Sequence, residues 1–393
     1  MSLYLEHLIK EKVNVELKRI QLSMQKEEQE IRIVLEKEGY SIKYINFQNN
    51  SINGVIEKSN RKFFFKLLGN QDFNNEITGY IEIKDKFPVN KIEEIYEFQN
   101  CCIIIYEYEN TIHNNEGLLN DFLVQNDEEI KENPKQIIQR IISLYSNSLK
   151  TTVNNSQYPM QQFYQDRIEA RLIKWYNKEK IFGYKVNING IDGKKTSEII
   201  KEVINFFGKE HKLECSLSQG DPNTLNIGIK PMFFDFATSG YNPIICEFSA
   251  IFWSVLIADA YFCPKYHPKS YYNHKKVFEN IDKFTPDLQY EVNDIEKKIN
   301  IQANIKTSKI RIDFIKEYIE MLENLNVKIG KEFIYFLAMR ILCIFDIRTM
   351  SKEDYFYSIF ILHYLYENIL DDIYTSLTNI VDNFDVIGGK INE

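Results

Sequence analysis

The chain reads SQGDPNTLN at residues 218–226 and, after an apolar segment, DFATSGYNP at residues 235–243. Asp221 and Asn226 stand five residues apart, and Asp235 follows an apolar hairpin. A carboxylate at 221 can orient and deprotonate a hydroxyl, and oxygens at 226 and 235 suit Mg²⁺. These residue types indicate phosphoryl transfer, which needs an acceptor hydroxyl held in line and the phosphate charge neutralised.

A simpler interpretation of the same residues is structural. Asp and Asn often do no more than cap turns. The three residues occur together, however, between apolar strands and before the tail Gly240 to Pro243. Their combination favours the functional interpretation.

The two segments resemble the aminoglycoside phosphotransferase and choline kinase-like family, which usually reads HGDxxxxN and then DF or DxD. The resemblance implies a protein kinase-like fold and a transferase that uses ATP (or GTP) with Mg²⁺. In that reading Asp221 is the catalytic base, and Asn226 and Asp235 are the metal ligands. Gln219 stands where the family usually has His, and Gln can hydrogen-bond but does not titrate. The hairpin before Asp235 is also shorter than usual.

The segment upstream supplies further parts in the expected order. Lys66 lies in the apolar strand predicted at 62–68, where a cation is costly unless it meets an anion. Glu76 lies ten residues later, in a helix predicted at 72–84. The resemblance implies a Lys66–Glu76 ion pair that holds the lysine on the nucleotide phosphates.

A hinge and a phosphate-covering loop are expected in the same region. The strand predicted at 102–108 runs into the hinge, where backbone groups of Glu107 and Glu109 would receive the adenine edge. The loop should lie between strands, at residues 48–54, yet it contains a single glycine, Gly54. Ser and Asn in this loop would then supply the hydrogen bonds.

We predict an α+β, two-lobed protein kinase-like fold. A helical N-terminal extension would span 1–38, a small β-rich nucleotide-binding N-lobe 39–109, and a large mainly helical C-lobe 110–393. The C-lobe would carry the catalytic loop at 218–243, followed by acceptor-binding helices.

The segments that flank these motifs also carry local signals. An apolar stripe at helical spacing in the N-terminal extension predicts packing on its own domain or, less favoured, a dimer contact. Residues 183–195 are predicted to be a loop, and residues 246–383 to form several helices. Glu247 falls where the family places an acid that braces the catalytic loop.

Composition excludes several classes of protein. The 393 residues carry 48 Lys and Arg against 56 Asp and Glu, a net charge of −8, which argues against nucleic-acid binding. Six cysteines without C-x-x-C spacing suggest free thiols in a reducing compartment. No run of about 18 uncharged apolar residues is present, so we expect a cytoplasmic protein that does not enter a membrane.

The acceptor is expected to be a small molecule bound through its hydroxyl: an aminoglycoside, a choline-like cation, a sugar or a nucleoside. An acidic lining would suit a cation, and an aromatic one a choline-like group or a sugar. Arg340 is predicted to form an internal ion pair with Asp346 and Arg348 nearby. The candidate acceptor residues are Tyr266, Tyr271, Tyr272, Asp346, Glu367, Asp371 and Asp372.

Two rival functions remain. Gln219 and the glycine-poor loop are compatible with a kinase-shaped pseudoenzyme that binds nucleotide without transfer. The second rival is an enzyme that transfers a phosphoryl group, or a nucleotidyl group, to a protein side chain. Asp235 reaches Pro243 within eight residues, which leaves little room for a peptide-docking segment and favours small acceptors.

Overall fold

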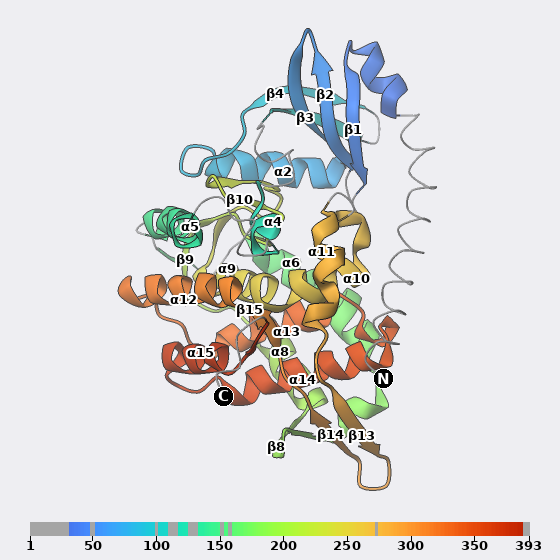
Figure 1. Cartoon of the computed structure of the whole chain (residues 1–393), viewed down its shortest axis with the longest axis vertical. Helices are drawn as coiled ribbons and strands as arrows, with labels where there is room; N and C mark the ends of the chain where they lie inside the picture. Colours follow the sequence, from blue (N-terminus) through green and yellow to red (C-terminus); the bar gives the residue numbers. More distant parts are fainter. Residues whose placement is uncertain are drawn as a thin grey trace.

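The computed structural model describes residues 31–47, 52–98, 101–108, 117–124, 133–149, 153–155, 159–271 and 274–387. A β-sheet lobe lies at one end of the long axis and a mainly helical lobe at the other (Figure 1). This is the two-lobed α+β architecture that the sequence predicted. Most of the N-terminal extension, residues 1–30, lies outside the described residues, and so does any dimer contact through it.

The small lobe is a five-stranded antiparallel sheet in the order β1-β2-β3-β5-β4. Its strands are β1 Ser41–Phe47, β2 Ile52–Lys58, β3 Arg61–Gly69, β4 Ile92–Glu97 and β5 Cys101–Glu107. The predicted strands had omitted β4, whose sequence IEEIYE is polar because it forms a sheet edge.

Apolar side chains on the two faces of this sheet join different cores. Phe63 and Phe65 on β3 belong to a core that Ile31 and Leu35 of the helical segment 31–37 complete. On the other face, Tyr106 joins the core of the large lobe. Helix α2 (Asn70–Ile83) lies between the sheet and the large lobe (Figure 1). The sheet is thereby attached to the helical lobe through α2.

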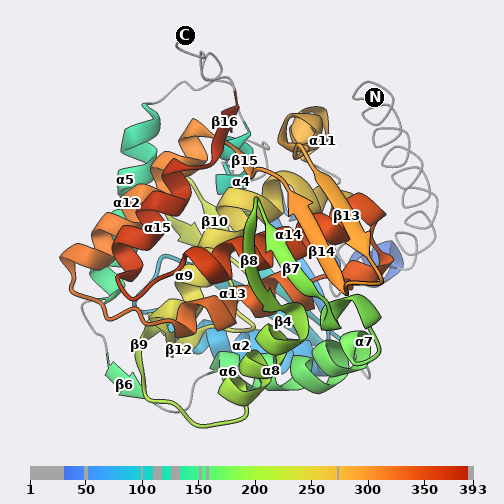
Figure 2. The same cartoon turned by 90° about the horizontal axis from the view of Figure 1, so that it is seen from below.

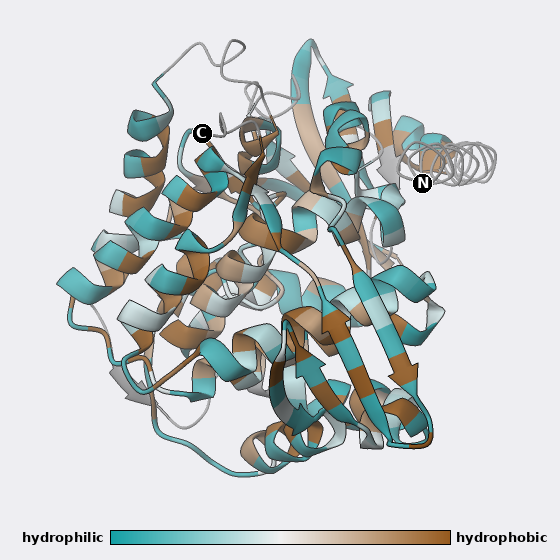
Figure 3. Ribbon diagram, turned by 60° about the horizontal axis from the view of Figure 1, so that its bottom comes forward, coloured by the Kyte–Doolittle hydropathy of each residue, from teal (hydrophilic) through white to brown (hydrophobic). Residues whose placement is uncertain are grey.

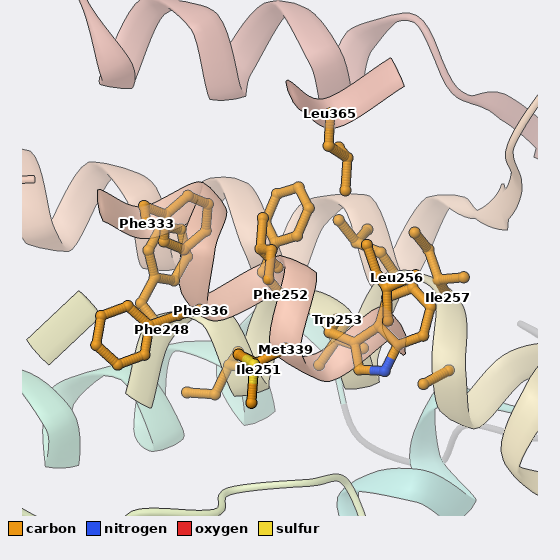
Figure 4. Packing of buried hydrophobic residues seen from close by; sticks show 14 of the residues in the cluster. Phe248, Ile251, Phe252, Trp253, Leu256, Ile257, Phe333, Phe336, Met339 and Leu365 are labelled. Carbon is orange, nitrogen blue, oxygen red and sulfur yellow. The ribbon is translucent and has the colours of Figure 1, made fainter. Parts of the chain in front are cut away.

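The large lobe is centred on one long apolar helix, formed by α9 (Ile244–Trp253), η4 (Ser254–Phe262) and α10 (Cys263–Tyr266). By length and hydropathy it could cross a membrane, but its apolar window is entirely buried within the protein. Phe248 on α9 stacks on Phe333 of α13 (Glu332–Cys343), with ring centroids 4.9 Å apart (Figure 4). We conclude that this helix is the core of the lobe.

The remaining elements surround this helix. They are α4 Leu119–Leu123, α5 Pro134–Leu149, β6 Val153–Asn155, α6 Pro159–Arg167, η2 Ile168–Ile173, α7 Lys174–Tyr176, η3 Lys180–Gly183, α8 Thr196–Phe207, β9 Leu213–Ser218, β10 Ile227–Gly228, β11 Met232–Phe233, β12 Gly240–Pro243, η5 Pro268–Tyr271, α11 Lys275–Asn280, η6 Ile281–Phe284, β15 Lys306–Ser308, α12 Lys309–Asn324, η7 Ile347–Thr349, α14 Lys352–Asn368, α15 Ile373–Asp382 and β16 Asp385–Ile387.

Residues 183–195 are not the predicted loop. They contain the hairpin β7 (Lys185–Ile188) and β8 (Ile191–Lys195), which joins β13 (Gln289–Asn293) and β14 (Lys298–Gln302) in a four-stranded sheet below the helices (Figure 2). Apolar and polar residues alternate along β7, β13 and β14 (Figure 3). Asn189 and Gly190 at the turn have φ of 51° and 87°, as a tight hairpin requires. The segment was predicted to be a loop because many of its residues are polar.

The two lobes approach closely at Gly79 on α2. A Cβ at this position would lie 1.7 Å from the carbonyl oxygen of Phe236, which follows Asp235. Only a glycine therefore allows α2 to pack directly on the segment after Asp235.

Substituting Gly79 with alanine should destabilise the protein, by about 1–3 kcal/mol or more, because the added methyl group overlaps a backbone oxygen. Helix propensity alone predicts the opposite sign, a gain of roughly 1 kcal/mol. The matched control is Gly69→Ala, where an added Cβ meets nothing within 4 Å. Urea unfolding of the three proteins tests this, and equal stability of both variants would contradict the close contact.

Candidate active site

The two quoted segments lie side by side because the strands that lead into and out of them are paired. β9 precedes the first segment and pairs with β12, which ends the second, with Ser218 opposite Gly240. Gly220 has φ of 88°, and a Cβ there would lie 2.2 Å from the carbonyl oxygen of Thr238. The loop at Asp221 is thus packed directly against the loop at Asp235.

Lys66 forms two ion pairs at the junction of the lobes. Its Nζ lies 2.9 Å from Oε2 of Glu76 and 2.7 Å from Oδ1 of Asp235. The expected Lys66–Glu76 pair is therefore present, and Asp235 is a second partner. The side chains of Lys66 and Glu76 are 9% and 1% exposed, whereas that of Asp235 is 48% exposed. Asp235 is the member of the triad that a ligand can reach.

Glu76 connects three parts of the chain. Its Oε2 pairs with Lys66 of β3. Its Oε1 accepts a hydrogen bond from the Tyr106 hydroxyl of β5 at 3.0 Å. Its Oε2 accepts one from the Phe236 backbone N–H, also at 3.0 Å. This carboxylate positions the segment at Asp235 as well as the lysine. Tyr106 was not anticipated from the sequence, although it lies in the predicted hinge strand.

Both carboxylates stabilise the charge of Lys66, whereas burial and the charge of Asp235 raise the pKa of Glu76. Burial alone would lower the pKa of Lys66, but the Asp235 and Glu76 carboxylates outweigh it and raise that pKa. Burial would likewise raise the pKa of Asp235, but Lys66 holds it below its usual value. The lysine is thus a permanent cation beside a permanent carboxylate, as a site for a polyphosphate and a metal requires.

Gln219 joins the two loops in place of the family's histidine. Its Nε2 donates to the carbonyl oxygens of Phe234 and Asp235 at 2.8 and 2.5 Å. Its Oε1 accepts from the Asp221 backbone N–H at 2.8 Å. An amide supplies both a donor and an acceptor, so Gln219 braces the loops without titrating.

Asn226 lies between Asp221 and Asp235. Its Nδ2 donates to the Asp221 carbonyl oxygen at 3.0 Å, and its own carbonyl oxygen accepts from the Phe234 N–H at 3.0 Å. The side-chain oxygen of Asn226 and the exposed carboxylate of Asp235 are left as hard oxygen donors. Among the described residues, no three His, Cys, Asp or Glu side chains gather into a metal site. Two oxygen ligands nevertheless fit Mg²⁺, which usually keeps waters and takes phosphate oxygens as its other ligands.

Two buried acids on the long apolar helix accept hydrogen bonds from the loop at 218–226. Glu247 Oε2 accepts from the Gly220 N–H at 2.8 Å, which is the bracing contact predicted for this residue. Asp259 Oδ2 accepts from the N–H and the hydroxyl of Thr224 at 3.0 and 2.6 Å, while its Oδ1 accepts from the Tyr271 hydroxyl. Asp259 was missed, although an acid inside an otherwise apolar helix was a signal for it.

Arg340 does not pair with Asp346, contrary to the prediction. Asp346 pairs with Arg348 alone, at 2.7 Å. Arg340 Nη1 lies instead 2.5 Å from Oδ1 of Asp221, and its Nε donates to the Tyr164 hydroxyl at 3.1 Å. Packing of α13 on α9 turns Arg340 toward the catalytic loop, whereas Asp346 follows the end of α13. The arginine is 4% exposed and Asp221 31% exposed, so Asp221 keeps one side open.

The backbone groups of Glu107, which were expected to receive the adenine edge, have partners within the small lobe. The N–H of Glu107 donates to the Lys91 carbonyl oxygen at 2.8 Å, and its carbonyl oxygen accepts from Asn90 Nδ2 at 2.9 Å. The hinge role of Glu107 stays a prediction. Glu109 lies outside the described residues.

The expected acceptor residues that the structure describes have hydrogen-bond or ion-pair partners within the protein. Tyr266 bonds Asp354, Tyr271 bonds Asp259, and Asp346 bonds Arg348. The three remaining acids bond residues outside the loop at 218–226. Glu367 accepts from the Lys194 N–H, Asp371 pairs with Lys331, and Asp372 caps α15. Tyr272 lies outside the described residues. No acidic lining of the site comes from the described members of this set.

Comparisons with known proteins give likenesses of fold only. No known family profile and no curated protein matches the chain. The aminoglycoside phosphotransferase APH(4)-Ia is 9% identical, with TM-score 0.44 over 87% of this chain and 94% of that chain. Spectinomycin phosphotransferase APH(9)-Ia, in complex with ADP and spectinomycin, is 9% identical, with TM-score 0.36 over 88% and 93%. At TM-scores below 0.5, these likenesses add no support to the geometry described above.

The pKa of Glu247 gives a pH-dependent stability. Burial raises this pKa from 4.5 to about 7, and the bond from Gly220 offsets only part of the shift. Between these pH values the folded chain keeps a proton that the unfolded chain releases, so raising the pH favours unfolding. Relative to Glu247→Gln, the wild type should lose roughly 3 kcal/mol of unfolding free energy from pH 4.5 to 7.

Urea unfolding of both proteins at pH 4.5, 5.5, 6.5 and 7.5 measures this difference. Other titrating groups cancel between the two proteins. A difference that is constant across the range would show that Glu247 ionises normally.

Proposed function

We propose that the protein transfers the γ-phosphoryl group of ATP, or GTP, to a hydroxyl of a small molecule, in the cytoplasm. The observation that carries this proposal is the convergence of Lys66, Glu76 and Asp235 beside the loop that holds Asp221 and Asn226. These residues are far apart in the sequence and polar, and they meet between two lobes. A purely structural network gives no reason for an exposed carboxylate at Asp235 beside a buried cation.

Each residue has a distinct task in this reaction. Lys66, held by Glu76, would bind the α- and β-phosphates. Asn226 and Asp235 would hold Mg²⁺, which when bound would neutralise phosphate charge. Asp221 would orient the acceptor hydroxyl and accept its proton through the carboxylate oxygen that Arg340 leaves open. Gln219, Glu247 and Asp259 keep the loop in place.

Asp221→Asn should lower kcat by about 100-fold or more, since general base catalysis typically contributes 10²–10⁴ in rate. Nucleotide binding should persist because Lys66 and Asp235 are intact. It is measured as the rise in melting temperature that ATP and Mg²⁺ cause. Asp371→Asn removes an exposed carboxylate at a surface pair and serves as the control. Unchanged turnover in Asp221→Asn would refute its assignment as the base.

Asp235→Asn should weaken nucleotide binding in a metal-dependent way. The variant loses a charged metal ligand and one of the two anions that stabilise Lys66. Titration of ATP with and without Mg²⁺ should show that the gain in affinity from Mg²⁺ shrinks by about tenfold, the effect of roughly 1.4 kcal/mol. If Mg²⁺ strengthened binding equally in both proteins, Asp235 would not be a ligand.

One observation favours a second candidate, a pseudoenzyme that binds nucleotide without transfer. Arg340 occupies one oxygen of the proposed base, at 2.5 Å. The pseudoenzyme would show the metal-dependent thermal shift with no turnover over a broad panel of acceptors. The phosphotransferase would show both, with turnover lost in Asp221→Asn.

A further inference from the structure

Three arginines gather behind the proposed base. Arg340 comes from α13, Arg167 from the end of α6 and Arg171 from η2. Arg340 bonds Asp221, and Arg171 Nη1 donates to the carbonyl oxygen of Cys343, one turn beyond Arg340 on α13. We call Arg167, Arg171 and Arg340 the arginine cluster.

Two members of the arginine cluster share an aromatic ring. The guanidinium carbon of Arg167 lies 3.2 Å from the ring centroid of Phe163, and that of Arg340 lies 5.8 Å from the same centroid. Arg167 Nη1 donates to the Phe163 carbonyl oxygen at 3.0 Å. Apart from the Arg340–Asp221 ion pair, the contacts of these arginines are with backbone oxygens, the Tyr164 hydroxyl and aromatic rings, which carry no full negative charge.

Like charges lie close together in the arginine cluster. Burial, together with the positive charges of Arg171 and Arg340, lowers the pKa of Arg167 to about 10, and the charge of Asp221 offsets only part of this shift. Glu247 is a second carboxyl group close to Asp221, and burial raises its pKa to about 7, so it adds only part of a negative charge. Like charges that are partly removed from water repel one another unless an anion joins them.

Two buried donors of the arginine cluster also lack a partner. Arg340 Nη2 and Arg167 Nε have no hydrogen-bond acceptor among the described residues. Arg340 as a whole is 3% exposed. A buried guanidinium N–H without an acceptor costs free energy, and a carboxylate or phosphate oxygen would satisfy it.

We propose that the acceptor is a small hydroxylated anion, which binds the arginine cluster through a carboxylate or phosphate group and presents its hydroxyl to Asp221. This rests on the proposed phosphotransferase function and names its substrate class. The acceptor is therefore unlike the cations that an acidic site would select. Arg340 also acts as a positioning residue, since it fixes the orientation of the Asp221 carboxylate.

In the transfer step, the acceptor oxygen forms a bond to the γ-phosphorus, and the bond from that phosphorus to the β,γ-bridging oxygen breaks. The hydroxyl proton passes to Asp221, and the nucleoside diphosphate leaves with the bonding electron pair. The product carries both its original anionic group and the new phosphate.

Substitution at Arg167 tests the proposal, since Arg167 does not contact Asp221. With ATP and Mg²⁺, initial rates are compared for glycerol 3-phosphate and glycerate (anionic), glycerol (neutral) and choline (cationic). We expect the anionic acceptors to have KM values at least about tenfold lower than glycerol. Arg167→Gln should raise those KM values about tenfold and change kcat by less than about twofold, whereas Arg167→Lys should recover most of the loss.

Arg61→Gln is the matched control, because it removes one exposed arginine charge at the start of β3 in the small lobe. Equal use of choline or glycerol, or unchanged KM values in Arg167→Gln, would overturn the anionic acceptor and leave the phosphotransferase standing. A purely structural Arg167 would lower the melting temperature of Arg167→Gln but leave the ratio of KM values for anionic and neutral acceptors unchanged, and that result too would overturn it.

Binding without turnover separates the two proposals. Glycerol 3-phosphate and glycerate are titrated calorimetrically into the protein with saturating ADP and Mg²⁺, so that the nucleotide site is filled. Binding that weakens with salt and is lost in Arg167→Gln supports the anion site, even if no acceptor is phosphorylated and the proposed function fails. Absence of binding by both anions would overturn the anion site.

Discussion

The ion triad of Lys66, Glu76 and Asp235 is the constraint on which the arrangement of the two lobes depends. A buried ammonium group is stable only beside anions, and these come from a helix of the small lobe and a loop of the large lobe. Glu76 also accepts the backbone N–H of Phe236, and α2 contacts the same segment through Gly79. Charge and close packing therefore place the small lobe over the catalytic loop in one position.

The apolar helix of the large lobe supports the loop from the other side. Its α9 and η4 parts are buried throughout, yet they carry Glu247 and Asp259, which accept hydrogen bonds from Gly220 and Thr224. Such acids are tolerated in a core because each is bonded to a loop N–H. The helix packs on α13 through the stacked rings of Phe248 and Phe333. Because the two acids lie on this packed helix, the core holds the loop in place. A rigid scaffold is what a base and its metal ligands need.

The sequence allowed prediction of the parts that local chemistry marks. Lys66 was visible as a lysine inside an apolar strand, and Asp221, Asn226 and Asp235 as polar residues at a recognisable spacing. Arg340 was misassigned because its partner is 119 residues away, and nearer charges offered a simpler pair. The bonds of Glu107 to Lys91 and Asn90 could not be predicted because they depend on how an edge strand begins. The hairpin at 185–195 was missed because only pairing with β14 reveals its buried face.

The nucleotide side and the acceptor side of the site therefore have different origins. Lys66, Glu76, Asn226 and Asp235 belong to short motifs that local sequence reveals, whereas the arginine cluster comes from helices without a motif and forms only when α6 and η2 pack on α13. The charge on the acceptor side is then set independently of the charge on the nucleotide side. A chain can keep the phosphoryl-transfer geometry and change the acceptor it selects by altering guanidinium groups that do not touch the phosphates. The short motifs therefore support the proposed reaction, and the arginine cluster supports the proposed class of acceptor.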